Sequence, residues 1–315
     1  MPAVTTMPAL DPQESAARRR AWWPARRTVL AYGLLAPAFA AVVFLIAYPL
    51  YLALAVSFRE GRTMNLARLD RLPVGWGNYA RVFDDPALWS AFARSAVYVG
   101  GAIVPAFVIG LLLALLLNRV FPGRRWLRSV MMLPWAVPGV VVSIAFLWLF
   151  DGSYGVVNSL LRRVGVLDEG IAWFARQDTA MLAVVVPTVW KAFPFFALTA
   201  LAAMQAIPLA LYEAARIDGA GALAQHRYVT WPGIRGPMLL ALILNALWAL
   251  KELDIVYVTT GGGPAGATET LALRIYFEAF QYFRLGSASA LGLMLMVLCA
   301  VLVLLALPRL RQRFF

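Results

Sequence analysis

Charged residues are scarce in this sequence, and acidic ones are scarcest. Asp, Glu, Lys and Arg make up 14% of the chain, whereas 62% is hydrophobic; a soluble domain carries roughly a quarter charged residues. The single cysteine, Cys299, excludes an intramolecular disulfide. The single histidine, His226, has no second ligand nearby, so we interpret it as a solvated loop residue rather than a metal ligand. The phosphate-binding pattern G-x-x-x-x-G-K-[ST] does not occur in the sequence.

The hydrophobic residues gather in long runs. A helix that spans a bilayer needs about 20 mainly apolar residues, and four runs of that length contain no Asp, Glu, Lys or Arg. Two further runs carry a few charges. We therefore predict an all-α integral membrane protein with six transmembrane helices, over residues 29–58, 95–118, 129–150, 179–206, 236–260 and 288–307. The polar residues before the first run, and its length, indicate a retained anchor rather than a cleaved signal peptide.

The arginines orient the chain. With both termini on the cytoplasmic side, the inner segments hold fifteen arginines against four acidic residues, while the outer loops are nearly balanced. This asymmetry follows the positive-inside rule and predicts a multi-pass protein of the cell (inner or plasma) membrane, with a cytoplasmic N-terminal tail over 1–28 and a C-terminal tail over 308–315. A basic patch on a soluble fold, which nucleic-acid binding needs, is not visible, so no nucleic-acid partner is predicted.

The outer loops also carry local patterns. Residues 59–94 and 151–178 form two polar loops between spans. Gly261-Gly262-Gly263-Pro264 breaks the chain after the fifth span, and the amphipathic stretch that follows, 268–285, predicts a short helix lying at the outer membrane surface.

One polar segment, 207–235, separates the fourth and fifth spans on the cytoplasmic side. Pro208 ends the fourth span, and Leu209–Ile217 is predicted to form a helix. Gly219 and Gly221 break that helix, and Ala222–Trp231 forms a second one before Pro232-Gly233. The product is a helix-turn-helix knob that projects into the cytoplasm.

The spacing within this knob resembles the EAA loop of ABC-importer permeases, whose pattern is EAA-x3-G-x9-I-x-L-P. Here Glu213-Ala214-Ala215 precedes Gly219, and Trp231-Pro232 closes the pattern. Val229 and Trp231 replace Ile and Leu, and both keep an apolar residue. The resemblance extends over most of the chain to the permeases that import maltose, related oligosaccharides and glycerol-3-phosphate, of which this chain is similar to the first subunit of a pair. The further motifs that carry it are Met132–Pro138, Phe150-Asp151-Gly152 with Gly155–Asn158, Pro187–Lys191 and Tyr257–Pro264.

This resemblance implies a type I ABC importer permease fold and a set of partners. A second permease subunit would complete the pathway as a heterodimer, two copies of an ATPase would bind the EAA loops, and an extracytoplasmic binding protein would deliver a sugar. The chain itself would hold no cofactor, because ATP-Mg would bind to the ATPase. The coupling residues implied are Glu213, Ala214, Ala215, Asp218, Gly219 and Pro232.

Charged and polar residues inside the spans indicate a substrate pathway, because intramembrane charges are costly and usually face a cavity or a partner. Asn245, Trp248 and Glu252 recur on one helical face, and Thr188, Lys191 and Phe195 form the same pattern on the fourth span. The resemblance places the same positions at the sugar site of maltose-type permeases. Those sites are neutral, whereas Lys191 and Glu252 are charged.

Structural roles for these residues stay open. Lys191 could pair with Glu252 or Asp254 and tie the two spans together, and Trp248 could serve packing alone. We expect Lys251 and Asp254 to face elsewhere, toward the partner subunit or the span ends. As an alternative function, Lys191, Glu252 and Asp254 could relay protons in a carrier driven by an ion gradient. A membrane-embedded enzyme would need a catalytic cluster, which the sequence does not show.

Overall fold

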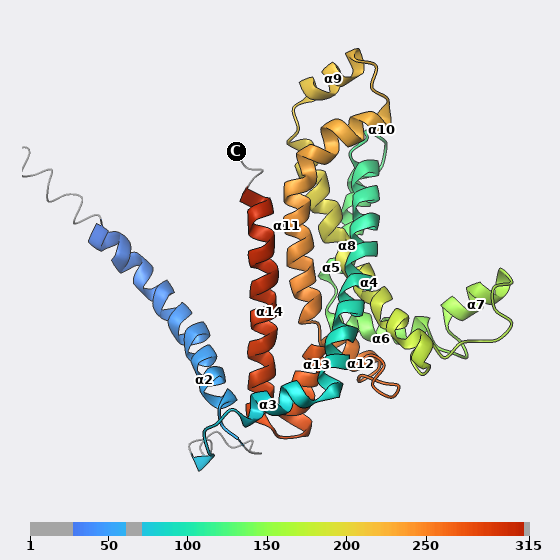
Figure 1. Ribbon diagram of the computed structural model, residues 1–315. Coiled ribbons are helices and arrows are strands. Elements are labelled where there is room, and N and C mark those ends of the chain that lie inside the picture. The colour runs from blue at the N-terminus through green and yellow to red at the C-terminus, as the bar shows by residue number, and fades with distance from the viewer. Residues whose placement is uncertain (1–27, 61–70, 312–315) are drawn as a thin grey trace, which may run out of the picture. The chain divides into compact units, whose positions relative to one another are not determined.

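The computed structural model describes residues 28–60 and 71–311, which divide into two units at Val56–Ser57 (Figure 1). The described part of the first unit is one apolar helix with a mean hydropathy of 2.4. A π-helical turn, η1 (Val43–Ala47), interrupts it before α2 (Tyr48–Ser57). The Tyr48 N–H donates to the Val43 carbonyl five residues back, and this wider turn precedes Pro49, whose ring would clash with the carbonyl four residues back in a regular helix.

The second unit is a bundle of helices around α4 (Pro86–Leu117) and α8 (Gln177–Gln205), which share the largest helix interface of the described residues. Small residues make this interface close: Ala102, Ala106, Gly110 and Ala114 recur every four residues along α4, and all are buried. Stripes of small residues let helix backbones approach closely, which is how helices associate in membranes. Two further helices, α11 (Trp231–Leu250) and α14 (Leu285–Arg311), extend the bundle.

The third predicted span, 129–150, is bent. It consists of α5 (Arg124–Ala136) and α6 (Gly139–Leu149), whose axes differ by 98°. Val137 at the break is extended, with φ −75° and ψ 132°, because the ring of Pro138 disfavours helical backbone in the residue before it. The described residues therefore contain five helices of spanning length and one bent pair, which together make up to six spans.

The fifth predicted span, 236–260, is also interrupted. Its first part, α11, ends at Leu250, and the chain resumes as the short helix α12 (Asp254–Thr259), which packs against α6. The amphipathic stretch that follows forms α13 (Leu271–Tyr276) and the π-helical segment η4 (Phe277–Gln281). Thr270 starts α13 by accepting a hydrogen bond from the Leu273 N–H.

Two polar clusters order the loops that connect the spans. In the loop 151–178, which contains α7 (Val156–Arg163), the fully buried Asn158 donates to the carbonyls of Asp151, Gly152 and Ile171 and accepts from the Trp173 Nε1–H. The Asn of the motif Gly155–Asn158 thus has a structural role.

The second cluster joins α13 and η4 to the start of α4. Arg274 lies 2.8 Å from Asp85, 3.2 Å from Glu269 and 3.3 Å from Glu278. Burial disfavours the charge of this guanidinium, but hydrogen bonding and the charges of the neighbouring acids outweigh it and raise the pKa of Arg274. A short helix, α3 (Gly77–Asp84), packs on α14 at the same end of the bundle.

Candidate functional site

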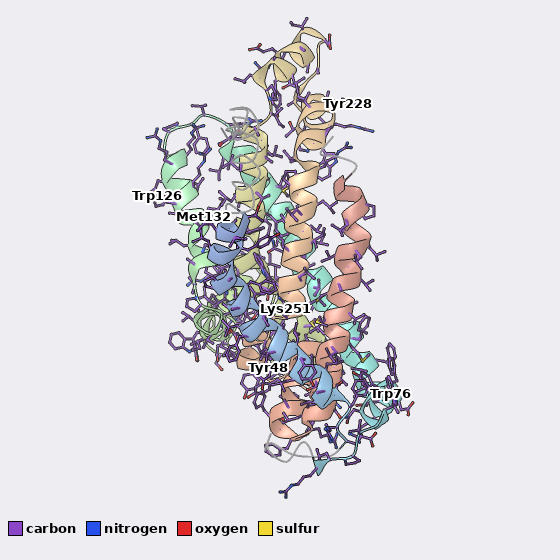
Figure 2. The ribbon with its side chains drawn as sticks, turned by 90° about the vertical axis from the view of Figure 1, so that its left-hand side faces the viewer. Tyr48, Trp76, Trp126, Met132, Tyr228 and Lys251 are labelled. Atoms are coloured by element: carbon purple, nitrogen blue, oxygen red, sulfur yellow. The ribbon has the colours of Figure 1, made fainter. Side chains whose placement is uncertain are left out.

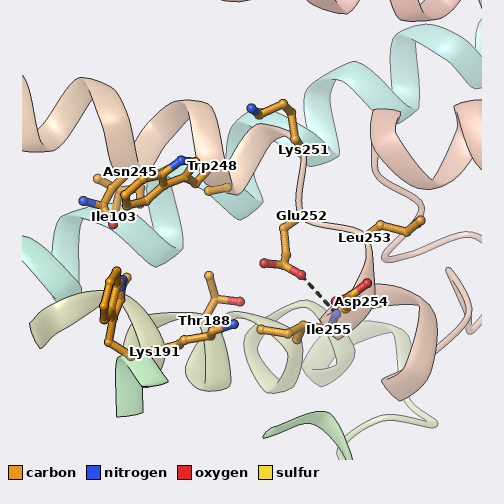
Figure 3. A pocket seen from close by; sticks show the side chains of 13 residues that line it. Ile103, Thr188, Lys191, Asn245, Trp248, Lys251, Glu252, Leu253, Asp254 and Ile255 are labelled. Atoms are coloured by element: carbon orange, nitrogen blue, oxygen red, sulfur yellow. Dashed lines mark hydrogen bonds between the residues drawn. The ribbon is translucent and has the colours of Figure 1, made fainter. Parts of the chain in front are cut away.

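A cavity of about 560 Å³ opens among α4, α5, α8 and α11, beside the break before α12. Its volume is that of a site for a small ligand. Asn245 and Trp248 of α11 face Thr188 and Lys191 of α8 across it (Figure 3). The complete lining is Ile103, Trp135, Thr188, Lys191, Ala192, Asn245, Trp248, Ala249, Lys251, Glu252, Leu253, Asp254 and Ile255.

The structure brings five of the six predicted pathway residues together in this cavity: Thr188, Lys191, Asn245, Trp248 and Glu252. The sixth, Phe195, is not among the lining residues. It packs edge to face on Trp248, with ring centroids 5.2 Å apart, and so helps to hold the indole in place.

The expectation for Lys251 and Asp254 is wrong, because both line the same cavity. The prediction assumed that the helix of the fifth span continues through residue 254. Instead, α11 ends at Leu250, and the non-helical residues 251–253 place Lys251 and Asp254 on the cavity wall. The ammonium group of Lys251 nevertheless points away from the Glu252 carboxylate (Figure 3).

The polar groups of the cavity differ in how far they are already satisfied. The Thr188 hydroxyl lies 2.6 Å from the Tyr98 hydroxyl and 3.3 Å from the Val184 carbonyl, so it is engaged within the protein. Asn245 donates from its amide nitrogen to the Ala241 carbonyl at 2.9 Å. The described residues offer its Oδ1 no hydrogen bond, which leaves that oxygen as a free acceptor.

Both carboxylates stand at the starts of helices. Glu252 Oε1 accepts a hydrogen bond from the Ile255 N–H at 3.3 Å, at the start of α12 (Figure 3). Asp254 Oδ2 lies 3.1 Å from the place that a Cβ at Gly139 would occupy, at the start of α6. Negative charge is favoured at a helix N-terminus.

The alternative that Lys191 ties the spans together through a direct ion pair is not realised in the described part of the chain. No carboxylate oxygen there lies within 4.0 Å of its ammonium nitrogen. Lys191 therefore remains a hydrogen-bond donor on the cavity wall.

Sequence reasoning also missed Trp135, which lines the cavity, and Tyr98, which holds Thr188 on its wall. Trp135 lines the cavity from α5 and is 49% exposed; no signal of helical spacing links it to the residues of α8 and α11. Tyr98, which bonds Thr188, is fully buried in α4 and had no such signal. Across residues 28–60 and 71–311, no three His, Cys, Asp or Glu side chains gather as a metal site would require.

A second candidate site is the helical knob between α8 and α11, which lies at the same end of the bundle as the C-terminal end of α14 (Figure 1). The predicted first helix is confirmed as α9 (Leu209–Ile217). It ends in a Schellman motif: the Ala220 N–H donates to the Ala215 carbonyl at 2.8 Å, and the Gly219 N–H donates to the Arg216 carbonyl at 3.0 Å. Gly219 has φ +78°, the left-handed conformation that this motif requires.

The prediction that the second helix of the knob ends at Trp231, before Pro232-Gly233, is wrong. The α-helix α10 (Ala222–Gln225) and the π-helix η3 (His226–Thr230) continue directly into α11. The Trp231 N–H donates to the His226 carbonyl five residues back, and this π turn accommodates Pro232 as η1 accommodates Pro49. His226 is half-buried rather than solvated.

The knob presents an exposed surface of mixed character. The predicted coupling residues Glu213, Ala214, Asp218, Gly219 and Pro232 are exposed, and Ala215 is half-buried. Large apolar side chains surround them, including Ile217 at 87% and Leu223 at 82% exposure; Tyr228 also projects from this end (Figure 2). A hydrogen bond of 3.0 Å between the hydroxyls of Tyr212 and Thr230 braces the two helices of the knob. Such a concentration of exposed apolar groups marks a surface for a partner.

Comparison with known proteins agrees with this arrangement. Residues 106–313 match the family model described as "Binding-protein-dependent transport system inner membrane component". The chain is 36% identical to the sulfoquinovosyl glycerol transport system permease protein SmoG of Agrobacterium fabrum, over 91% of this chain and 93% of that protein. It is 37% identical to the trehalose/maltose transport system permease protein MalF of Thermococcus litoralis, over 73% of this chain and 76% of that one.

The fold also matches a solved structure. A chain from a bacterial ABC transporter involved in the import of the acidic polysaccharide alginate superposes with a TM-score of 0.80, at 22% identity, over 94% of this chain and 100% of that chain. This likeness confirms the predicted all-α fold of a type I ABC importer permease.

Proposed function

The chain belongs to the family of binding-protein-dependent transport system inner membrane components, and from this we propose that it is the permease subunit of an ATP-driven importer for a sugar or sugar-related compound. The observation that carries the proposal is the cavity itself. It lies between the helices of an importer fold and combines indole surface, a free amide oxygen and charged groups. The protein is accordingly a transporter subunit and not an enzyme.

The chemistry of the cavity suits a sugar. A sugar ring has apolar C–H faces and a rim of hydroxyls, so it needs apolar walls and hydrogen-bonding groups together. The exposed face of Trp248 supplies the first, and Asn245 Oδ1, Glu252 and Lys191 supply acceptors and a donor. The names of two relatives, for sulfoquinovosyl glycerol and for trehalose/maltose, support sugars as the substrate class.

The partners that we propose follow from the resemblance to importer permeases and from the exposed surface of the knob. A second permease subunit completes the pathway, two copies of an ATPase bind the knobs, and an extracytoplasmic binding protein delivers the sugar. The ATPase holds ATP-Mg, and this chain holds no cofactor. The knob and both termini lie on the cytoplasmic side of the cell membrane. Closure of the ATPase moves the permeases as rigid bodies between inward- and outward-facing arrangements.

Uptake by the reconstituted complex tests this proposal. Proteoliposomes with both permeases and the ATPase, supplied with binding protein, are expected to take up maltose, trehalose or sulfoquinovosyl glycerol only when ATP is on the ATPase side. Leaving out the binding protein or the ATPase is expected to remove uptake. Uptake by this chain alone under a proton or sodium gradient would instead favour the secondary carrier and reject the importer.

Glu252 provides a residue-level prediction. Losing one hydrogen bond to a substrate costs about 1–3 kcal/mol, so Glu252→Ala is expected to reduce uptake at limiting substrate about tenfold, since each 1.4 kcal/mol is a factor of ten. ATP hydrolysis stimulated by the loaded binding protein is expected to fall less, because the knob is untouched.

The control for Glu252 separates ligand from structural roles. Glu252 also accepts the hydrogen bond of the Ile255 N–H, and Glu252→Gln keeps an acceptor for it. A role in α12 alone predicts normal uptake by the Gln variant. If Lys191→Ala combined with Glu252→Ala recovers assembly and uptake, the pair is structural and Glu252 is not a substrate ligand.

A further inference from the structure

A second cavity, of about 170 Å³, lies at the end of the bundle opposite the knob, where α4 and α14 begin beside α13 (Figure 1). We call it the leucine-lined cavity; its walls are formed by Leu88, Trp89, Phe92, Leu271, Leu291, Met294 and Leu298. We propose that it binds one acyl chain of a phospholipid whose phosphate group lies at the exposed Arg81 of α3. This lipid site is separate from the substrate cavity and does not depend on the proposed transport function.

The leucine-lined cavity has a buried floor and an open side. Leu88, Leu271 and Leu291 are buried and belong to a cluster that joins α4, α13 and α14. Trp89 and Phe92 are 51% and 41% exposed, so the opposite wall lies at the protein surface. Protein interiors contain few voids larger than a water molecule, and an apolar cavity of this size stays dry and takes apolar ligands.

The size of the leucine-lined cavity favours an acyl chain over a protein helix. A helix with its side chains is about 10–12 Å across, and a cavity of about 170 Å³ is too small to seat one. An acyl chain is narrow, flexible and free of polar groups. Because α4 and α14 both have the length and hydropathy of membrane spans, their outward surfaces face acyl chains in a bilayer.

Aromatic side chains indicate that the open side lies at the boundary between acyl chains and headgroups. The rings of Phe83, Trp89 and Phe92 follow one another, with centroids 6.3 and 6.4 Å apart. The Trp89 Nε1–H donates to the Phe83 carbonyl at 3.0 Å, which ties the indole to the end of α3. Tryptophan is enriched at this boundary, so we expect the headgroup of a bound lipid to lie beside α3.

The position of the phosphate follows from Arg81, in the last turn of α3. Its side chain is exposed, and Nη1 donates to the Ser287 hydroxyl at 3.1 Å. Across residues 28–60 and 71–311, no carboxylate oxygen lies within 4.0 Å of its guanidinium nitrogens. A guanidinium has five N–H donors and binds phosphate through paired hydrogen bonds, so Arg81 has donors left for a headgroup.

A small polar cavity lies between Arg81 and the leucine-lined cavity. Its volume is about 20 Å³, room for about one water molecule, and Leu88 and Leu291 line both cavities. The other charged residues on its wall are Asp85, Arg274, Glu278 and Arg284. Arg274 lies 2.8 Å from Asp85 and 3.3 Å from Glu278, which compensates both acids. The headgroup therefore lies outside the small polar cavity, where Arg81 is exposed, and the acyl chain extends from there past α4.

The test measures how tightly the purified full-length chain binds phosphatidylglycerol, by native mass spectrometry during a titration in detergent. Leu298→Phe fills the leucine-lined cavity from a half-buried position. It is expected to weaken the tightest-bound lipid about tenfold, as the loss of roughly two buried methylene groups would. Arg81→Gln removes the cation and is expected to weaken the same lipid about fivefold. Inorganic phosphate, which has no acyl chain, is expected not to compete.

Two matched controls are expected to bind the lipid like wild type. Val297→Phe enlarges the neighbour of Leu298, which is 57% exposed and not among the lining residues. Arg163→Gln removes an arginine from the last turn of α7, as Arg81→Gln does from α3. The unfolding midpoint without added lipid shows whether each variant is folded, and Met294→Phe fills the same cavity if Leu298→Phe is not.

The opposite results would overturn the proposal. If wild type and the folded filling variants bind phosphatidylglycerol equally, no acyl chain occupies the leucine-lined cavity. If Leu298→Phe leaves lipid binding unchanged but reduces copurification with the second permease, the cavity is a protein interface. Competition by inorganic phosphate would mean that Arg81 binds phosphate without a lipid, and unchanged binding by Arg81→Gln would reject Arg81 as the headgroup contact.

Discussion

Replacing Gly219 with valine is expected to abolish ATP-driven uptake, whereas asparagine at the same position retains most of it. Gly219 stands at φ +78° in the Schellman motif that ends α9. A β-branched residue is a genuine outlier in this conformation, while asparagine visits it readily. Beyond its two chain neighbours, no heavy atom of the described residues lies within 4 Å of a Cβ built there, so the effect of valine is conformational and not a clash.

Backbone strain in Gly219→Val is expected to disturb the surface around Glu213. Without the left-handed residue, the hydrogen bond from the Ala220 N–H to the Ala215 carbonyl cannot form in this geometry. The last turn of α9, which carries the exposed Ile217, then loses its fixed orientation toward the second helix of the knob. If the knob has the proposed coupling role, a surface that is not held rigidly will not transmit closure of the ATPase to the spans.

The measurement pairs binding with transport. For Gly219→Val, membrane insertion and copurification with the second permease are expected to equal wild type, while copurification with the ATPase and stimulated ATP hydrolysis fall more than tenfold. Gly221→Val is the matched control, because Gly221 is extended, with φ −70° and ψ 174°, which valine adopts easily. Normal uptake by Gly219→Val would refute the coupling role of this turn.

The bounds of α9 could be predicted from the sequence because its punctuation is local. Pro208 disfavours helical backbone in the residue before it, and Gly219 adopts the left-handed conformation that ends a helix. The helix between them can therefore be predicted without knowledge of tertiary contacts. The same reasoning failed at Pro232, because a π turn accommodates a proline within a continuous helix. A π turn is defined by its i→i−5 hydrogen bond, and the residue types of this segment do not predict that bond.

The residues of the cavity also divide into those that helical spacing could predict and those that it could not. Asn245 and Trp248, and Thr188 with Lys191, could be placed together because each pair lies within one unbroken helix, where spacing defines a face. The period loses its meaning where a helix breaks. Asp254 therefore escaped prediction, since its position depends on the turn after Leu250. Trp135 escaped it because the packing of α5 against α8, which spacing does not give, places its helix beside the cavity.

The roles of the gathered residues need more than their placement. Thr188 was predicted as a sugar contact from its helical face, yet its hydroxyl is bonded to Tyr98 and to the Val184 carbonyl. A partner on another helix, more than eighty positions away in the chain, cannot be inferred from spacing. Whether Thr188 contacts the sugar stays a prediction, whereas its bond to α4 is a structural finding.

The packing of α4 against α8 is where we expect a substitution to have its largest effect on stability. Gly110→Ala is predicted to weaken the bundle markedly, and Gly110→Leu to prevent its folding. A Cβ at Gly110 would lie 2.5 Å from Cβ of Phe196, 2.8 Å from the Phe193 carbonyl oxygen and 2.9 Å from the Ala197 nitrogen. Two of these atoms are backbone, so a rotamer change cannot relieve the clash and the helices must separate.

Separation of α4 and α8 would open the whole stripe of small residues. Ala102, Ala106 and Ala114 lie on the same side of α4 as Gly110 and are fully buried, and overpacking of such a core costs about 1–3 kcal/mol for the smallest insertions. The control is Gly100→Ala on the same helix, where, apart from the adjoining backbone of that helix and the two chain neighbours, no heavy atom of the described residues lies within 4 Å of the added carbon. It gains roughly 0.5–1 kcal/mol of helix preference over glycine without a clash.

Thermal unfolding of the detergent-solubilised chain and the amount of folded protein in the membrane measure the difference. We expect a lower midpoint for Gly110→Ala, little or no folded Gly110→Leu, and a midpoint at or above wild type for Gly100→Ala. Equal midpoints for the two alanine variants would show that α4 and α8 are not packed as closely as described. The same interface holds Tyr98 against Thr188 on the cavity wall, so Gly110→Ala is also expected to lower uptake per folded molecule, while Gly100→Ala leaves it unchanged.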